Sequence, residues 1–259
     1  MVGLPPLQKV IATCSVRGTK LVMLGLLLLL CYPLAAQQTY VTQYDFYAGY
    51  AFLNSPKIGL FENGFQTQFG YRAKPWLSLG FDYSYTRGDL TITPDLLPTA
   101  LQQQLGAEIG QLIAAKVIPP TYALTVPAHS VTNSFAVGPQ FAYRHFSKVT
   151  FFIRPSFGAI REAATPAPGD PIAVSVVAQL APTGHKVDWQ GFYGVGGGVD
   201  LIFSKHVGLR VQADQVWDHL FNDLLAQGRW TTRFSIGPCF NFGKNIMEDK
   251  ALTPATPKK

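Results

Sequence analysis

The sequence predicts an all-β fold, an eight-stranded antiparallel up-and-down transmembrane β-barrel with one helical external loop. Three observations predict it. Apolar and polar side chains alternate along eight segments, and the links between these segments alternate between short and long. Charged residues make up only 14% of the chain, against roughly 25% in an average soluble domain. A chain with so few charges and 13% aromatic residues fits a sheet that exposes one apolar face.

The segment Arg229–Phe242 shows the pattern of a membrane strand most fully. Its residues alternate from Trp230 onward, and a period of two is typical of a strand, in which successive side chains point to opposite faces. Aromatic residues stand at both ends of the apolar face, from Trp230 to Phe242, whereas the other face carries Arg233 in its middle. An apolar face that meets lipid and a polar face that meets the barrel interior are expected of such a strand. This segment is predicted to close the barrel.

The other seven predicted strands share this alternation. They are Val41–Leu53, Gly64–Arg72, Trp76–Thr86, Val131–Arg144, Val149–Glu162, Trp189–Phe203 and Val207–Asp218. The register of the first strand is the least certain, because Tyr47 and Leu53 fall on the face that is otherwise polar.

The links between these strands predict which end of the barrel is which. Three links hold about three or four residues, near Ala73–Pro75, His145–Lys148 and Ser204–His206, and the other four are longer, namely Asn54–Asn63, Gly88–Ser130, Ala163–Asp188 and His219–Arg229. Alternate links of an up-and-down barrel lie at the same end, so the short turns share one rim and the long loops share the other. Outer-membrane barrels have short periplasmic turns and long external loops.

The N-terminal segment has the features of a secretory signal peptide. Lys20 precedes the apolar run Leu21–Leu30, and small residues favour cleavage near Ala36. The alternative, an uncleaved anchor, requires about 20 apolar residues, and Pro33 interrupts the run. No later stretch is long enough for a helical span, so strands must form any membrane span. The predicted organisation is a signal peptide over 1–36, a barrel domain over 37–243 and a flexible periplasmic tail over 244–259, with the mature protein in the bacterial outer membrane.

Eight charged residues of the predicted strands fall on the inward face. They are Asp82, Arg144, Arg154, Glu162, Asp200, Arg210, Asp214 and Arg233, four acids and four bases. Buried charges need partners, and an eight-stranded barrel is just wide enough to be filled by side chains. We therefore expect a salt-bridged plug; the alternative is an ion path or a gated pore.

The long link Gly88–Ser130 is the predicted helical external loop. Apolar residues recur in it at the spacing of one helix face, at Leu97, Leu101, Leu105, Ile109 and Leu112. Pro119 and Pro120 stop this helix. Its stripe is expected to pack on the apolar run Ile172–Val177 of the next long loop. The alternatives are a cap over the barrel mouth, an interaction with lipid and an interaction with an external ligand.

Several segments resemble those of a known family of membrane barrels. They are Phe46–Asn54, Val137–Arg144, the glycine-rich Gly194–Leu201 and the closing Arg233–Phe242. The chain, over about Tyr40–Gly243, resembles the small bacterial outer-membrane β-barrel proteins related to the OmpA transmembrane domain and the opacity-type adhesins. The resemblance implies that Phe240 and Phe242 carry the signal that the outer-membrane assembly machinery reads. About seventeen further residues follow Phe242, which departs from the family pattern.

Motifs that could carry chemistry have simpler structural interpretations. The run Gly194–Gly198 could cradle phosphate only if a helix followed it, yet a strand pattern continues. His145 and Ser147 could form a base and nucleophile pair, but they lie in a predicted polar turn. Cys239 alternates with Phe240 and is expected to be buried. We predict no catalytic, cofactor-binding or metal-binding residues.

The function expected from these patterns is that of a non-enzymatic outer-membrane barrel with a structural or surface-interaction role. Its expected partners are outer-membrane lipid, the assembly machinery and an unidentified external ligand, with the protein acting as a monomer. Removal of residues 1–36, which hold three bases and no acids, lowers the formal charge from +6 to +3. This small surplus gives no reason to expect nucleic acid. The alternatives are an outer-membrane lipid-modifying enzyme and a soluble lipocalin-like carrier.

Overall fold

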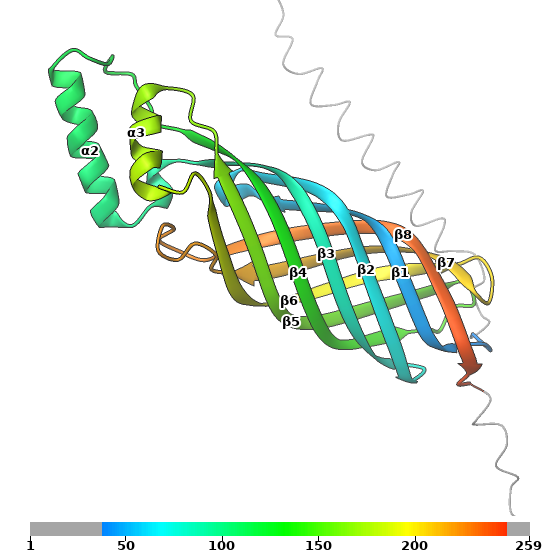
Figure 1. Ribbon diagram of the computed structural model, residues 1–259. Coiled ribbons are helices and arrows are strands. Elements are labelled where there is room, and N and C mark those ends of the chain that lie inside the picture. Colours follow the sequence, from blue (N-terminus) through cyan, green and yellow to red (C-terminus); the bar gives the residue numbers. More distant parts are fainter. Residues whose placement is uncertain (1–37, 248–259) are drawn as a thin grey trace, which may run out of the picture.

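Eight strands close into an antiparallel barrel in which each strand pairs with its neighbours in the sequence and β1 pairs with β8 (Figure 1). The computed structural model describes residues 38–247. The strands are β1 Thr42–Ser55, β2 Leu60–Lys74, β3 Leu77–Ile92, β4 Val126–Tyr143, β5 Val149–Pro166, β6 Lys186–Ile202, β7 Val207–Asp218 and β8 Arg229–Asn245. The predicted fold class is confirmed.

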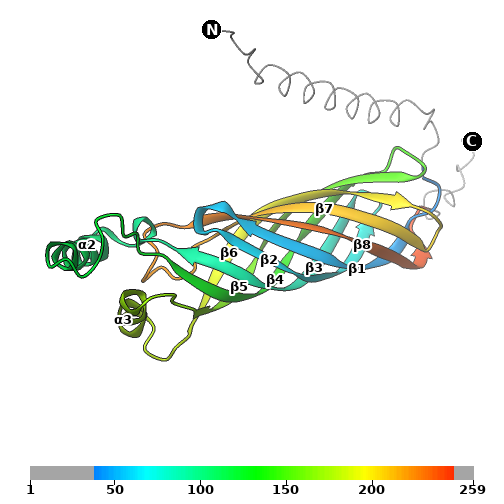
Figure 2. The same cartoon turned by 90° about the horizontal axis from the view of Figure 1, so that it is seen from above.

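Four short helices lie between strands at one end of the barrel, which we call the helical end (Figures 1 and 2). They are the 3-10 helices η1 Pro56–Ile58 and η2 Pro94–Leu96 and the α-helices α2 Thr99–Ala114 and α3 Pro171–Leu180. The links after β2, β4 and β6 are short and lie at the opposite, short-turn end. No helix among residues 38–247 is long and apolar enough to cross a membrane.

The period-two pattern gave the correct face for the side chains of every predicted strand. On β1, Phe46 and Tyr50 are exposed, whereas Tyr47 and Leu53 are buried inside the barrel. In the register that β1 adopts, Phe46 and Tyr50 therefore lie on the outer face of the barrel, and Tyr47 and Leu53 lie on the inner face.

Two boundaries differ from the sequence prediction. The link predicted over Asn54–Asn63 is not a long loop, because β1 and β2 extend until only Pro56–Gly59 separates them. Hydrogen bonding between strands explains the difference, since Phe61 and Glu62 pair with Asp89 and Gly88 of β3. At the other boundary, β8 continues to Asn245, two residues past the predicted end of the barrel domain. The predicted signal peptide over 1–36 and most of the predicted tail lie outside the described residues.

Candidate functional site: the filled lumen and its helical cap

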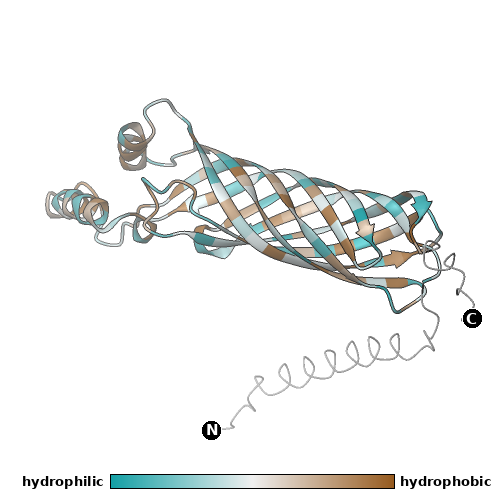
Figure 3. Ribbon diagram, turned by 90° about the horizontal axis from the view of Figure 1, so that it is seen from below, coloured by the Kyte–Doolittle hydropathy of each residue, from teal (hydrophilic) through white to brown (hydrophobic). Residues whose placement is uncertain are grey.

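The outer surface of the barrel carries a belt of exposed apolar side chains. Figure 3 shows hydrophobic and hydrophilic residues alternating along the strands of the barrel. Along β8 the exposed residues run from Trp230 through Ile236 to Phe242, so aromatic side chains stand on both sides of an aliphatic one. Tyr44 stacks on Phe242 near the short-turn end, with ring centroids 5.7 Å apart. Exposing this much apolar surface to water is unfavourable, and aromatic girdles around an apolar band are the arrangement that lipid stabilises.

Inside the barrel, the central layer consists of two arginines and two aspartates. Arg154 lies between Asp82 and Asp214, with N–O distances of 3.3 and 3.2 Å. Arg233 contacts the same two carboxylates at 3.1 and 2.8 Å. All four side chains are at most 4% exposed. Each carboxylate therefore has two cationic partners, which offsets part of the cost of burying charge.

A second layer of charges lies toward the short-turn end and is centred on Arg210. The Arg210 guanidinium donates to Asp200 at 2.7 Å and to Asp45 at 2.9 Å. Its flat face lies 4.9 Å from the ring centroid of Phe152, a geometry that favours cation–π attraction. Arg72 reaches Asp45 at 3.5 Å from the other side.

A third layer lies toward the helical end and has more acids than bases. Arg229 forms ion pairs with Glu162 and, at 3.1 Å, with Asp218. Glu62 instead accepts hydrogen bonds from the hydroxyls of Thr86, Ser130 and Thr132. This layer thus holds three carboxylates and one guanidinium, which pairs with two of them, whereas the central layer is balanced.

The structure places seven of the eight predicted lumen charges in these layers. They are Asp82, Arg154, Glu162, Asp200, Arg210, Asp214 and Arg233. Arg144 instead lies half-buried at the short-turn rim, where its Nε donates to the carbonyl of Pro75 at 2.8 Å. This residue follows the end of β4, so its side chain sits at the mouth of the barrel and joins none of the ion pairs formed by residues 38–247.

Five further buried charges of the lumen were not among the eight predicted from the sequence. They are Asp45, Glu62, Arg72, Asp218 and Arg229. A signal was available for Arg72 and Asp218, which alternate in phase with the inward residues of their strands. Glu62 was missed because its segment was assigned to a loop. Asp45 was missed because the register of its strand was ambiguous.

The glycine-rich segment of β6 makes room for other lumen side chains. A Cβ atom at Gly198 would lie 2.6 Å from the ring of Phe152, and one at Gly196 would lie 1.8 Å from an oxygen of Asp214. Because β6 continues as a strand through Ile202, no helix N-terminus follows these glycines to bind phosphate. Residues 38–247 contain no cluster of three or more His, Cys, Asp or Glu that could hold a metal. Cys239 is buried, in the position its alternation with Phe240 predicted.

The cap at the helical end is a small core formed by α2 and α3 (Figure 2). Leu97 and Leu105 are buried there together with Val176 of α3, and the partly buried Leu101 and Ile109 pack against them. Leu112 is half-buried near the end of α2. The stripe of the predicted helix therefore packs on the next long loop, as one of the sequence interpretations expected. That loop forms a helix of its own, which the sequence analysis did not predict.

Asp170 fixes the start of α3 and links it to the loop that follows α2. Its Oδ1 accepts hydrogen bonds from the backbone N–H groups of Ile172 and Ala173, both at 2.9 Å, which is the usual role of an aspartate at a helix N-cap. The Tyr122 hydroxyl donates to the same oxygen at 3.0 Å. These donors, the Ala173 N–H foremost, lower the pKa of Asp170.

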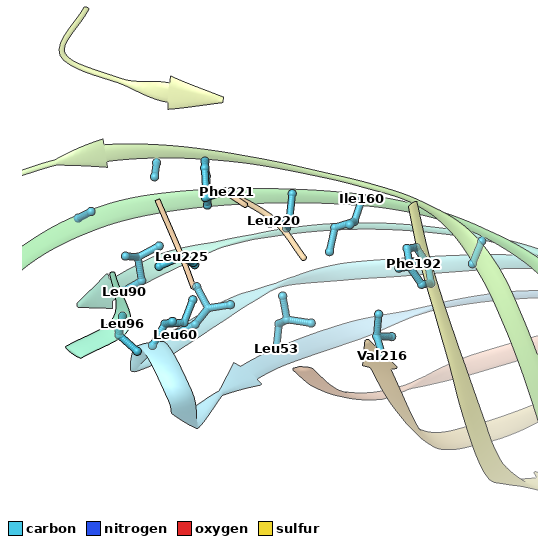
Figure 4. Packing of buried hydrophobic residues seen from close by; sticks show 14 residues of the cluster. Leu53, Leu60, Leu90, Leu96, Ile160, Phe192, Val216, Leu220, Phe221 and Leu225 are labelled. Atoms are coloured by element: carbon cyan, nitrogen blue, oxygen red, sulfur yellow. The ribbon is translucent and has the colours of Figure 1, made fainter. Parts of the chain in front are cut away.

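The link over residues 219–228 folds back into the barrel mouth and closes it with apolar side chains (Figure 4). Leu220, Phe221 and Leu225 belong to one buried apolar cluster with inward residues such as Leu53 and Phe192. Leu220 is only 1% exposed, and the backbone N–H of Ala226 donates to the carbonyl of Leu96 at 3.0 Å. We call residues 219–228 the plug loop. The sequence predicted a salt-bridged plug and a long loop over this link, so the apolar closure is an additional finding.

Together these features define a closed barrel with an apolar exterior, a lumen filled by ion pairs and a helical cap. No protein-family model matches the chain, and no curated protein matches it. Among solved structures, Neisserial surface protein A is similar over 77% of this chain and 96% of its own, with 12% identity and a TM-score of 0.47. Ail, the attachment invasion locus protein of Yersinia pestis, solved with the heparin analogue sucrose octasulfate, is similar over 78% and 99%, with 13% identity and a TM-score of 0.44. The N-terminal β-barrel domain of Pseudomonas aeruginosa OprF is similar over 78% and 98%, with 10% identity and a TM-score of 0.38. These similarities are too remote to indicate a function.

Proposed function

We propose that this protein is an integral outer-membrane barrel that conducts no solute and displays its helical cap outside the cell as an interaction surface. The observation that carries the proposal is the division between the two faces of the sheet. Phe157 and Tyr193 are about 60% exposed on the outside, whereas Arg154 and Arg210 are nearly fully buried on the inside. Only a lipid environment makes this division favourable.

A soluble carrier with a lipocalin-like barrel is disfavoured by the contents of the lumen. Such a carrier holds its ligand in an open apolar interior, but here the central layer of Asp82, Arg154, Asp214 and Arg233 occupies that space. The same layer disfavours solute passage. We therefore assign the function to the external surface of the helical cap. Loops held on a rigid scaffold commonly carry the function of a protein.

The arrangement also favours a non-enzymatic role. His145 and Ser147 lie in the short turn between β4 and β5, where the ring of His145 stacks on Tyr143. This turn is at the end of the barrel opposite the cap. A lipid-modifying enzyme of the outer leaflet needs its base and nucleophile at the external rim. In the proposed orientation the external rim is the helical end.

The proposal is tested by making the native chain in bacterial cells and separating the inner and outer membranes. We expect the protein in the outer membrane, migrating faster on a gel when unboiled than when boiled, because a folded barrel resists detergent. In planar bilayers the purified barrel should give no stable conductance steps. A soluble periplasmic protein without a mobility shift would overturn the membrane assignment, and steady ion conductance would overturn the closed lumen.

The orientation and the surface role have a separate test. Protease added to intact cells should cleave between α2 and β4, within residues 115–125, if the cap lies outside. Deletion of residues 97–122 with a short glycine linker should leave the heat-modifiable barrel intact. Protection of the loop in intact cells, with cleavage only after the outer membrane is opened, would contradict the proposed orientation.

A further inference from the structure

The short-turn rim of the barrel carries a surplus of exposed positive charge. Four exposed lysines stand there, Lys74 and Lys244 near the ends of β2 and β8 and Lys148 and Lys205 in the turns after β4 and β6. Within the described part of the chain, the acids at this end are Asp45 and Asp200. Both are buried in the lumen and paired with Arg210, so they do not offset the charge of the rim.

Part of this rim is hollowed into an open groove that extends from the end of β8 to the turn after β4. Lys74, Arg144 and Lys244 line it. The hydrogen bond from Nε of Arg144 to the carbonyl of Pro75 fixes one of these three cations in the wall of the groove. No acid among residues 38–247 lines the groove. A lining of this kind attracts an anionic occupant.

Aromatic side chains connect the groove to the lipid-facing surface of the barrel. Trp76 lines the groove, its ring centroid lies 5.7 Å from Nζ of Lys74, and it stacks on Phe141. Tyr71 also lines the groove, and its ring centroid lies 5.7 Å from that of Tyr44. Aromatic rings at the border of an apolar belt are expected at the level of the lipid head groups. This continuity favours a membrane lipid as the occupant over a molecule dissolved in the periplasm.

The charges of the groove restrict the head group of that lipid. Phosphodiester oxygens accept hydrogen bonds from the ammonium groups of Lys74 and Lys244 and from the guanidinium of Arg144. An ethanolamine or choline head group adds a cation, for which the described lining offers no acid. A glycerol head group adds no charge, so the phosphate alone determines the charge of the lipid. The groove therefore suits an anionic phospholipid better than a zwitterionic one.

We propose that this groove binds an anionic phospholipid of the phosphatidylglycerol type in the periplasmic leaflet of the membrane. The phosphate lies among Lys74, Arg144 and Lys244, and the acyl chains run along the exposed surface beside Trp76 and Phe141. The assignment to the periplasmic leaflet rests on the proposed function, which places the short-turn end on that side. The site gives the barrel a specific lipid partner at the end opposite the cap.

Trp76 is a reporter at this site. The chain has four tryptophans, and the other three, Trp189, Trp217 and Trp230, lie toward the helical end of β6, β7 and β8. The native chain is folded into phosphatidylcholine vesicles in which a fixed fraction of the lipid has brominated acyl chains and a glycerol, ethanolamine or choline head group. Bromine quenches the fluorescence of a tryptophan that it contacts. Both leaflets contain the brominated lipid, so the measurement does not depend on the orientation of the barrel.

The Trp76→Phe variant gives the quenching of the other three tryptophans, and the difference from the native chain belongs to Trp76. Trp76 is 51% exposed, so this substitution leaves the packing of the lumen intact. We expect phosphatidylglycerol to be preferred over phosphatidylcholine beside Trp76 by at least about fivefold, the effect of a basic residue near anionic lipid. Phosphatidylethanolamine should behave like phosphatidylcholine, and the preference should weaken as salt is added. Equal quenching of Trp76 by all three lipids would overturn the site.

The location is tested by removing one charge from the groove. Lys244→Gln should lower the preference for phosphatidylglycerol beside Trp76 by at least about twofold. Lys205→Gln is the matched control, because it removes the same charge from the same rim but outside the lining of the groove. An equal loss in both variants would mean that the whole rim, and not the groove, attracts the lipid.

The failure of this site and the failure of the proposed function have different signatures. A heat-modifiable native barrel in which Trp76 shows no lipid preference would overturn the site alone. A native chain that is not heat-modifiable would overturn the barrel itself. The series of head groups is measured on the native chain, so it decides the proposal even if Lys244→Gln does not fold.

Discussion

The two halves of the barrel interior are filled by different chemistry. In the centre, Arg154 and Arg233 share two carboxylates, and toward the short-turn end Arg210 holds a separate set of ion pairs. Toward the helical end, beyond the layer of charges around Arg229, Leu220 and Phe221 of the plug loop pack in a cluster of apolar side chains. The ion pairs need partners at fixed positions on several strands, whereas the apolar packing needs only volume. The first half therefore depends on the register of the strands, and the second depends on a loop that folds back into the mouth.

The largest effect is expected from removing Arg210. Asp200 has Arg210 as its ion-pair partner, and Asp45 keeps only the longer contact with Arg72. Arg210→Met should therefore lower the free energy of unfolding by about 3–5 kcal/mol, the usual cost of leaving a buried charge unpaired. This loss is measured by urea titration in lipid vesicles, in which the folded and unfolded fractions are quantified as separate bands on a gel.

Arg154→Met provides the comparison in the central layer of ion pairs. Asp82 and Asp214 both keep Arg233 as a partner, so the loss should be smaller, about 1.5–3 kcal/mol. The exposed Arg87 of β3 serves as the control through Arg87→Met. A larger loss of stability for Arg154→Met than for Arg210→Met would show that the stability of these layers does not depend on how many ion-pair partners each carboxylate keeps.

The plug loop is expected to stabilise the barrel without sealing it against ions. Leu220→Ala removes a side chain that is 1% exposed and should cost about 2–4 kcal/mol by leaving a cavity. The layer of Arg154 and Arg233 still fills the lumen, so planar-bilayer recordings should show no new conductance. Leu112→Ala, on a half-buried residue of α2, is the control. Conductance through the Leu220 variant would mean that the apolar half, and not the ion pairs, closes the barrel.

The faces of the strands could be predicted from the sequence because each depends on a local alternation. This is why Arg233 and Trp230 were assigned to the correct sides of β8. The length of β1 and β2 could not be read locally, since Phe61 and Glu62 become strand only by pairing with β3. For α3 a local signal did exist, an aspartate N-cap followed by Pro171.

The contents of the lumen were predictable only in part. An alternating pattern places Arg154 and Asp214 inside, but it does not state which carboxylate faces which guanidinium, because that depends on the stagger between strands. The plug loop has no periodic pattern at all. Its closure depends on a buried cluster in which Leu220 is joined by residues far away in the sequence, such as Leu53 and Phe192.

The smallest effect on stability is expected from a substitution in the cap, because the cap is expected to open without unfolding the barrel. Asp170→Ala removes the N-cap of α3 and the acceptor of the Tyr122 hydroxyl. Amide hydrogen exchange in α3 should then become roughly fivefold faster, while the urea midpoint of the barrel stays unchanged. Tyr122→Phe, which removes only the phenol hydrogen bond, should change the exchange less.

The pH dependence of the cap in the native chain follows from the same carboxylate. The N–H groups of Ala173 and Ile172 and the Tyr122 hydroxyl lower the pKa of Asp170 in the folded cap. Its stabilising contribution is therefore fully present above the pKa of an unfolded aspartate, about 3.9, and is lost as the pH falls through the lower folded value. Once corrected for the intrinsic pH dependence of amide exchange, exchange in α3 of the native chain should accordingly accelerate below about pH 4, and the Asp170→Ala variant should show no such step. An equal step in both proteins would mean that another group loosens the cap. If the urea midpoint of the barrel fell over the same pH range, α3 and the barrel would unfold as one unit. The cap would then not be separable from the rigid lumen.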